Sequence, residues 1–419
     1  MNFGSISSTS LLLAFIVYNV AFLVFVLAQV GKKWKGREPQ SHERAWGRAG
    51  FGLAVVGFLC QLVYFFTRWA EGGHIPTSNM YEFMTFLSMM VIAAFLIIHL
   101  IYKTSVLGMF AMPVGIIIIA YAAVFPSEVQ PLIPALSSVW LKIHVTTAAL
   151  GEAFFAVGFA GGLMYLLRTV DYRSGEPSDR KERRGVEVTL FVIVTLVAFV
   201  SSIFIFNSAG YRAEFAQQSI VTDKSGAEQT VTQKVEYVLP PIFAPANAET
   251  VTMTPFLGMS KPLLTAPSWM EGVNAGRKLN TVVWSLIGGA LLYGLLRLIA
   301  RKPLGAVVSP LLQSLDPEDL DEIGYRAIAI GYPIFTLGAL IFAMIWAQEA
   351  WGRFWGWDPK EVWALVTWLF YAAYLHLRLG RGWLGKKSAW LSVIGFIIVM
   401  FTLVGVNLII AGLHSYSGV

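Results

Sequence analysis

The amino-acid sequence predicts an all-α polytopic membrane protein with about ten transmembrane helices. Of its 419 residues, 56% are hydrophobic and only 13% are charged, and the mean hydropathy is +0.64. A water-soluble protein cannot use so much apolar material in its core. Apolar runs of roughly 20 residues, the length that crosses roughly 30 Å of hydrocarbon, also recur along the chain. Lipid is therefore the solvent for most of this protein.

The predicted helices are apolar runs that lack the period of a soluble amphipathic helix. The first run has no basic segment before it and no small-residue cleavage site after it. We therefore expect a retained first helix and not a signal peptide. The ten predicted spans are residues 9–30, 49–70, 81–102, 104–125, 140–168, 186–207, 279–300, 326–347, 361–379 and 389–411.

The basic residues predict the orientation of these spans. Most Lys and Arg residues lie in alternate loops, which the positive-inside rule assigns to the cytoplasm. Both termini are then expected on the non-cytoplasmic side. The net charge of +6 does not indicate nucleic acid binding, because the cations gather at helix ends and form no stripe. The single cysteine, Cys60, excludes a disulfide within the chain and a CxxC redox pair.

The chain is expected to have three regions. Residues 1–207 would hold the first six helices, residues 208–278 would form a long extracytoplasmic loop, and residues 279–419 would hold the last four helices. Within the loop, Val and Thr alternate with polar residues around a DKSG turn. This pattern predicts a small β-hairpin, followed by an extended Pro-rich run.

The tryptophan-rich segment 346–363, WAQEAWGRFWGWDPKEVW, is the strongest local signal and is predicted to lie on the outer face. An interfacial aromatic belt explains tryptophans at helix ends. It does not explain Trp351, Trp355 and Trp357, which share a short loop with Gly352. Glycine permits close approach of a planar partner, and flat, rigid rings stack well on a large aromatic ligand. The loop therefore predicts a site for such a ligand.

Charged residues of the same loop have two readings. Arg353 and Lys360 would suit acidic substituents on the planar ligand. The run Asp-Pro-Lys-Glu from Asp358 fits the N-cap and the first three positions of the next helix, with Glu361 able to bond back. This second reading is favoured for Asp358, and it makes that residue an organiser of the loop and not a ligand.

Two histidines are predicted to share the membrane face of the tryptophan-rich segment. His144 lies at the outer start of the fifth helix, and His414 lies just beyond the outer end of the last. A low-spin iron held by two imidazoles needs histidines on opposite faces of one plane. This pair could supply them beside the tryptophans.

The other four histidines differ in depth. His376 is about fifteen residues into the ninth helix, which at 1.5 Å per residue places it roughly 22 Å inward. His99 has a similar depth on the third helix. Ionisable groups within the hydrocarbon are expensive and tend to mark a site or pathway. His42 and His74, in loops, are better read as interfacial polar groups.

Several runs of this sequence resemble a known family. WAQEAWGRFWGWDPKEVWALVTWLFYAAYLHLR, GKKSAW and GVNLIIAGLHSYS are similar to the CcsA (ResC) subunit of the system II cytochrome c synthetase, which belongs to the haem-handling superfamily named for its WWD motif. WLKIHV and SNMYEFMTFLS match it more loosely. The close match covers residues 325–417, and the remainder agrees mainly in hydropathy. The loop 208–278 departs from the compact members of the family.

The resemblance implies that haem b from the cytoplasm is bound transiently as the substrate. His376 would be a ligand at an inner site, and His144 with His414 would be the axial ligands at an outer site. The second inner ligand is expected from a CcsB (ResB) partner, and His99 is the reserve candidate within this chain. The outer platform would consist of Trp351, Gly352, Trp355, Trp357 and Asp358.

The same resemblance implies a holocytochrome c synthetase subunit of the bacterial inner membrane, with its active face outside the cytoplasm. The reaction adds two cysteine thiols of a CxxCH segment across the haem vinyl groups, which requires reduced haem held in alignment. This chain contains no CxxCH, so those cysteines belong to a separate apocytochrome c. A thiol-reducing thioredoxin-like protein is a further expected partner. No nucleophile or general base is evident, and we expect catalysis by positioning.

Three alternatives remain open at this point. A haem transporter or chaperone, as in the CcmC branch of the superfamily, would leave ligation to another protein. A bis-histidine electron-transfer cytochrome would keep its haem and need no open tryptophan loop. A transporter of another planar compound would bind no haem. The combination of an inner and an outer histidine site favours the synthetase.

Overall fold

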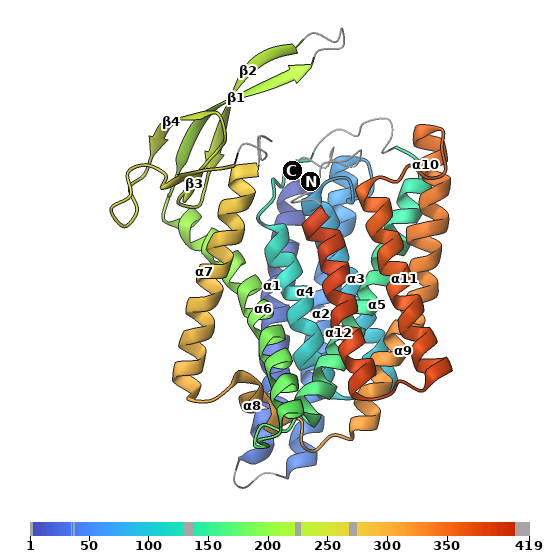
Figure 1. Ribbon diagram of the computed structural model, residues 1–419. Helices are drawn as coiled ribbons and strands as arrows, with labels where there is room; N and C mark the ends of the chain where they lie inside the picture. Colours follow the sequence, from blue (N-terminus) through green and yellow to red (C-terminus); the bar gives the residue numbers. More distant parts are fainter. Residues whose placement is uncertain are drawn as a thin grey trace. The chain divides into compact units, whose positions relative to one another are not determined.

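The computed structural model describes residues 3–34, 36, 38–129, 137–222, 228–267 and 275–406. Within them, ten helices are long and apolar enough to cross a membrane, which confirms the predicted fold class (Figure 1). Nine of these spans correspond to α1 (Phe3–Val30), α2 (Pro39–Gly72), α3 (Met80–Tyr102), α4 (Ser105–Ala122), α5 (Val139–Thr169), α6 (Pro177–Ser208), α7 (Ala275–Ala300), α11 (Pro359–Arg381) and α12 (Lys386–Met400). The tenth span contains both α9 (Pro317–Phe335) and α10 (Ala343–Trp351).

Shorter helical elements complete or connect these helices. The π-helical turn η4 (Thr336–Phe342) joins α9 and α10 into one continuous span, and a second π-helical turn, η5 (Phe401–Gly405), follows α12. The remaining elements are the 3-10 turns η1 (Gly31–Lys33) and η3 (Ser309–Leu311) and the short helix α8 (Leu304–Val308).

Several helices extend beyond the predicted apolar spans. α2 begins at Pro39 and α6 at Pro177, about ten residues before the apolar runs begin. Proline is favoured at the first helical position, and the polar residues that follow it continue the helix outside the hydrocarbon. The length of an apolar run reflects the thickness of the hydrocarbon layer, and it does not give the full length of the helix. The predicted span 389–411 reaches into residues that lie outside the described part of the chain.

The chain forms two compact units, Met1–Val186 with Gly305–Val419, and Glu187–Leu304. In the first unit the start of α1 and the end of α12 lie at the same end of the bundle, together with α10 (Figure 1). This is the arrangement that an even number of spans requires. The side of the membrane that this end faces stays a prediction, as does the division into regions 1–207, 208–278 and 279–419.

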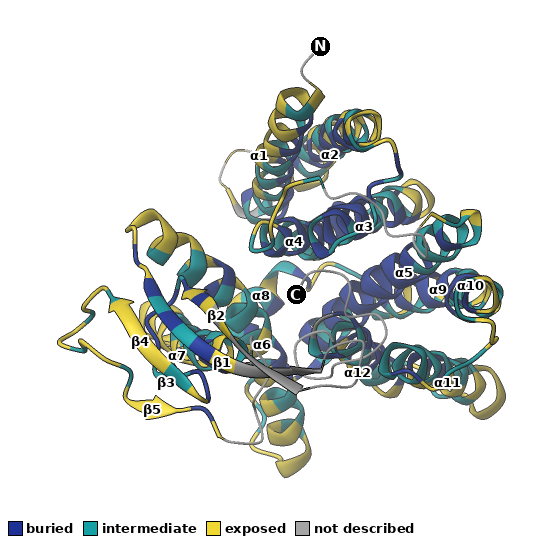
Figure 2. Ribbon diagram, turned by 90° about the horizontal axis from the view of Figure 1, so that it is seen from above, coloured by how far each residue is buried: buried dark blue, intermediate teal, exposed yellow. Residues whose placement is uncertain are grey.

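Helix α5 is the central helix of the first unit and is buried along most of its length (Figure 2). It packs against α3, α9, α12 and η4. Small residues allow this contact: Gly161 lies against Gly324, and Gly151 lies against Phe335. Helices in lipid associate mainly by such close packing, because the hydrophobic effect does not drive them together. α5 therefore gives the unit a rigid central element.

The second unit contains a small β-sheet with strand order β2-β1-β4. Strands β1 (Ala213–Thr222) and β2 (Glu228–Tyr237) pair antiparallel, with Ala213 opposite Tyr237, which confirms the predicted hairpin. β4 (Ala248–Met253) adds a third strand beside β1. The short strands β3 (Phe243–Ala244) and β5 (Leu264–Thr265) pair in parallel.

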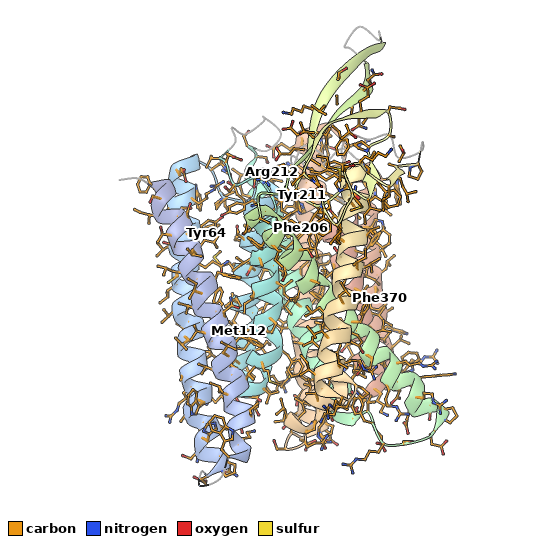
Figure 3. All side chains as sticks on the ribbon, turned by 90° about the vertical axis from the view of Figure 1, so that its left-hand side faces the viewer. Tyr64, Met112, Phe206, Tyr211, Arg212 and Phe370 are labelled. Atoms are coloured by element: carbon orange, nitrogen blue, oxygen red, sulfur yellow. The ribbon has the colours of Figure 1, made fainter. Side chains whose placement is uncertain are left out.

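Aromatic side chains and one amide fasten this sheet to its helices. Phe206, near the end of α6, and Tyr211, just before β1, lie close together (Figure 3), with ring centroids 5.8 Å apart. Burial raises the pKa of Tyr211 to about 12. On α7, the Asn280 side chain accepts hydrogen bonds from the N–H groups of Ile242 and Phe243 and donates to the Phe243 carbonyl. The unit is thus held together at its base.

Candidate functional site

A cavity of about 200 Å³ lies in the larger unit, at the end where α10 and the start of α11 meet α5. Its walls come from the loop before α3 and from α3, α5, α9, η4, α10, α11 and η5. Its ionisable lining residues, within the described chain, are His144, Glu152 and Lys360. A second cavity of about 110 Å³ shares His144 and Lys360 and extends to Trp351 and Trp355. The structure thus brings His144 and part of the tryptophan-rich segment together at one end of the larger unit.

The His144 side chain is held in one orientation by its neighbours. Its Nδ1 lies 2.9 Å from the backbone carbonyl oxygen of Gly338. A carbonyl oxygen only accepts, so Nδ1 carries the proton and Nε2 carries the lone pair. The imidazole also stacks on Trp346, with ring centroids 5.8 Å apart and planes within 12°. A histidine fixed in this way has the tautomer that a metal ligand at Nε2 needs.

The Gly338 carbonyl is available to His144 because η4 is a π-helical turn that passes very close to α5. Gly338 also accepts a hydrogen bond from the N–H group of Ala343 within the turn. A Cβ atom at position 338 would collide with the backbone of Thr147 and Ala148. π-helical turns are rare in proteins, but those that occur are often found at functional sites. The approach of the two backbones therefore requires glycine here.

The tryptophan rings form two edge-to-face pairs in the described segment. Trp346 is 2% exposed, and its ring lies 4.8 Å from that of Trp351 at an angle of 61°. Trp355 and Trp357 form the second pair, with ring centroids 6.1 Å apart at 84°. Trp357 is 70% exposed and has a φ of 56°, a left-handed conformation that is a clear outlier for a bulky residue. The loop therefore presents one ring outward at the expense of backbone strain.

Asp358 and Glu361 form the capping box that the sequence favoured. The Asp358 carboxylate accepts the N–H group of Lys360 at 3.0 Å. The Glu361 carboxylate accepts the N–H groups of Gly356 and Asp358 at 2.7 and 3.2 Å. Gly352 ends α10 in the left-handed conformation, with a φ of 69°. These residues shape the loop, and none of these observed contacts requires a ligand.

Comparisons with known proteins show the family of this chain. The family described as "Cytochrome C assembly protein" matches residues 77–184 and 281–414. A protein of Microcystis aeruginosa named "Cytochrome c biogenesis protein CcsA" is 33% identical over 403 residues, which is 95% of this chain and 96% of that protein. Proteins of the same name from Nostoc punctiforme and Trichormus variabilis are 34% identical over 388 residues and 32% identical over 410 residues, and cover 89% and 96% of this chain and 92% and 95% of their own lengths. The chain belongs to the CcsA family of cytochrome c assembly proteins.

The family model leaves out residues 1–76 and residues 185–280, and the second of these segments includes the β-sheet of the second unit. The CcsA relatives cover nearly the whole chain. The site described above lies wholly within the matched segments. The lining residues of both cavities thus belong to the part of the chain that the family model matches.

The predicted inner histidines of this CcsA-family chain lie on different helices. His376 is exposed on α11, which packs against α9, α12, η4 and η5. His99 is 8% exposed and stacks on Phe51 of α2, with centroids 4.7 Å apart. The described contacts do not bring the two histidines together. His414, the predicted outer partner of His144, lies outside the described residues.

Arg353 and Lys360 differ in their position relative to the cavities. Arg353 is exposed, and its guanidinium lies over Gly356; it lines neither cavity. Lys360 lines both. The sequence placed both cations near the tryptophans, but spacing along a loop does not say which side chain turns inward.

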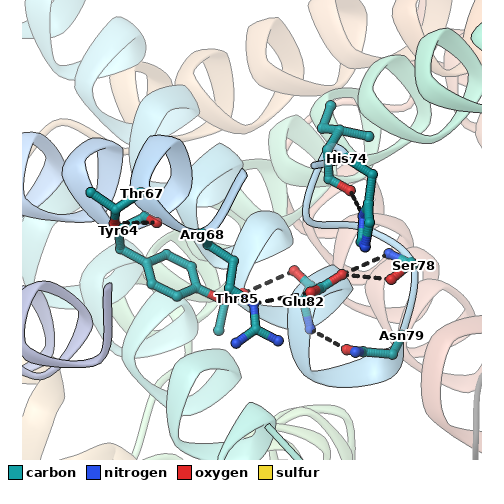
Figure 4. Close-up of polar contacts among 9 residues, drawn as sticks. Tyr64, Thr67, Arg68, His74, Ser78, Asn79, Glu82 and Thr85 are labelled. Atoms are coloured by element: carbon teal, nitrogen blue, oxygen red, sulfur yellow. Dashed lines mark hydrogen bonds and ion pairs between the residues drawn. The ribbon is translucent and has the colours of Figure 1, made fainter. Parts of the chain in front are cut away.

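A buried polar network beside the cavity was not identified from the sequence (Figure 4). Arg68 and Glu82, which are 8% and 1% exposed in their side chains, form an ion pair of 3.0 Å. The Glu82 carboxylate also accepts hydrogen bonds from the N–H and hydroxyl groups of Ser78 at 3.1 and 2.7 Å. The backbone N–H group of Glu82 donates to the side-chain oxygen of Asn79. Asn-x-x-Glu is a helix-start pattern, so SNMYEF carried a signal for this anchor of the cavity wall.

Glu152 is the second residue that sequence reasoning missed. It follows His144 by eight residues on α5 and lines the same cavity. It is 8% exposed, and its Oε2 has no hydrogen-bond partner among the described residues. Burial of an unsatisfied carboxyl oxygen is costly, so this group is a feature of the site and not a packing residue. Its position inside an apolar helix was the available signal.

Proposed function

We propose that this chain carries haem to an outer site at His144 and presents it, reduced, for thioether attachment to the CxxCH motif of an apocytochrome c. Family membership supports the broader role in cytochrome c biogenesis. The observation that carries the haem assignment is His144: its tautomer leaves Nε2 as the ligand atom, and its ring stacks on Trp346 in the wall of a cavity that extends to Trp351 and Trp355. His414 is proposed as the opposite ligand.

The proposed activity is that of a haem lyase subunit, and it requires a CcsB (ResB) partner. The exposed position of His376 on α11 supports this, because a ligand on the outside of a helix bundle is open to a second subunit. A bis-imidazole site leaves no open position for oxygen, and its axial ligands adjust the iron potential. We place the protein in the bacterial inner membrane with the His144 end outside, on the basis of the charge of its loops. A thioredoxin-like protein would keep the apocytochrome thiols reduced.

The first experiment is a reduced absorption spectrum of the purified protein, with and without the CcsB-type partner. His144→Ala, His376→Ala and His414→Ala are each expected to lose a bis-imidazole haem signal that added imidazole restores. His42→Gln is the control, because the His42 ring is held by the Leu27 carbonyl outside both cavities. An unchanged spectrum in all three variants would contradict the proposal.

A second measurement separates the alternatives. Haem bound by the wild-type complex is incubated with a reduced CxxCH peptide, and covalent attachment is measured by mass spectrometry. Attachment supports the lyase. Release of haem without attachment indicates a transporter or chaperone, and haem that stays bound indicates an electron-transfer cytochrome. A protein that never binds haem would indicate a different planar substrate.

A further inference from the structure

Lys360 is a cation in the wall of both cavities, and the Asp358 carboxylate is the acidic group that acts on it electrostatically. It stands at the second position of α11, and among the described residues no carboxylate forms an ion pair with its ammonium group. A charged amine in a partly desolvated position is expensive unless an anion meets it. The group is therefore poised for an anionic ligand.

The neighbouring acids are engaged elsewhere. The Asp358 carboxylate caps α11, and the Glu361 carboxylate holds the N–H groups of Gly356 and Asp358. Glu349 accepts a hydrogen bond from the Ser138 hydroxyl group. Asp358 attracts the Lys360 ammonium group electrostatically, but within the described chain none of these three acids forms a direct ion pair with it.

Glu152 lines the larger cavity with Lys360 but forms no ion pair with it in the described chain. Eight residues separate Glu152 from His144 on α5, a rise of about 12 Å, whereas Lys360 shares both cavities with His144. The cavity is therefore electrically asymmetric, with an ammonium group at one place and a carboxyl group at another. A carboxylate on a ligand would be attracted to the ammonium group.

We infer that Lys360 binds a propionate carboxylate of haem and thereby determines which edge of the macrocycle enters the cavity. This inference rests on the proposed function, since it names the recognition of the same substrate. Apolar side chains such as Leu141, Val145 and Phe335 surround the cavity and suit the porphyrin ring. Arg353, which lines neither cavity, has no part in this recognition.

The test compares ferrous protoporphyrin IX haem with its dimethyl ester, in which both propionates are neutral. Binding to the protein–partner complex is measured from the Soret band for wild type, Lys360→Met, Lys360→Arg and Arg353→Met. Wild type is expected to bind haem about 10- to 100-fold more tightly than the ester, as for one charge-assisted hydrogen bond. Lys360→Met is expected to lose that preference while its affinity for the ester is unchanged. Lys360→Arg and Arg353→Met are expected to keep it.

Each outcome bears on a specific claim. Equal affinity of wild type for haem and ester would overturn the inference without any mutation, as would a Lys360→Met variant that retains the preference. A variant that loses affinity for both ligands equally would show a structural role and also overturn it. If wild type binds neither ligand in a manner that depends on His144, the proposed function itself fails.

Discussion

Trp357 illustrates how a single residue in this loop is placed against its own preference. A left-handed φ of 56° on an exposed tryptophan carries strain of about 1–3 kcal/mol. The residue is 70% exposed, so its contact with Trp355 compensates for this strain only in part. The strain is consistent with selection for a ring that faces a ligand.

Trp357→Asn separates the strain from the ring, because asparagine tolerates the left-handed region. The variant is expected to unfold at an equal or higher temperature in detergent while binding haem more weakly. Trp34→Asn is the control: Trp34 is also exposed but has an extended backbone with a φ of −78°, so it should show no such gain. A Trp357→Asn variant that is less stable than wild type would show that the ring packs on protein.

The Arg68–Glu82 pair is the residue-scale anchor of the cavity wall. Arg68→Met leaves a buried carboxylate without its partner and is expected to cost about 3–5 kcal/mol. Arg326→Met removes an exposed pair with Glu322, for which about 0–1 kcal/mol is expected. Thermal unfolding in one detergent compares the two variants. Losses of similar size would mean that the Arg68–Glu82 pair is not a structural anchor.

The candidate site was predictable from the sequence in part. The segment 346–363, His144 and the cap at Asp358 were found because motif, topology and helix-start rules each act over a few residues. The sequence named both Arg353 and Lys360, but only Lys360 lines the cavities. This difference, and the position of Glu152 in the larger cavity, depend on the direction of single side chains in a folded cavity. Sequence spacing contains no such information.

At the scale of elements, the positions of the ten helices were predictable because each membrane-spanning helix needs its own apolar run of sufficient length. The ends of the helices were not predictable in this way, because helix propensity and not hydropathy decides how far the polar extensions of α2 and α6 continue. The interruption of α9–α10 by η4 was also missed. Pro333, inside α9 just before this turn, was a local signal for an irregular helix, whereas the contact between Gly338 and α5 joins residues that are remote in sequence.

Gly338→Ala tests that contact. A methyl group at this position cannot fit against the backbone of Ala148, so α5 and η4 must separate and the hydrogen bond to His144 must lengthen or break. We expect weaker haem binding and a spectrum with mixed ligation, even where the protein folds. Gly52→Ala is the matched control, because no atom lies within contact of a Cβ at that helical glycine. A normal haem spectrum in Gly338→Ala would mean that the carbonyl does not orient His144.

At the scale of the whole molecule, the β-sheet of the second compact unit was only partly predictable from the sequence. The hairpin of β1 and β2 was predictable from alternation around one turn. The pairing of β1 with β4, and the link from Asn280 to the base of the sheet, join residues tens of positions apart. Such long-range pairing is decided by the fold and leaves no local signature.

The orientation in the membrane is a property of the entire chain and can be tested directly. In a Cys60→Ala background, Ser178→Cys at the start of α6 is expected to react with a membrane-impermeant thiol reagent only after the cells are lysed. Ser260→Cys in the outer connection is expected to react in intact cells. Both positions are exposed. The opposite pattern of labelling would reverse the predicted topology.

The π-helical turn η4 has one more consequence. Such a turn holds one residue more than the α-helical turn it replaces, and each residue of an α-helix advances the chain by about 100°. Deletion of one residue from η4 would therefore leave the span intact but turn α10 by about 100°, and Trp346 and Trp351 with it. The direction in which these tryptophans face relative to His144 therefore depends on the number of residues in η4, which determines the rotation of α10 about its axis. Among descendants of this sequence, a one-residue gap at this point would move the aromatic platform without altering any of its residues.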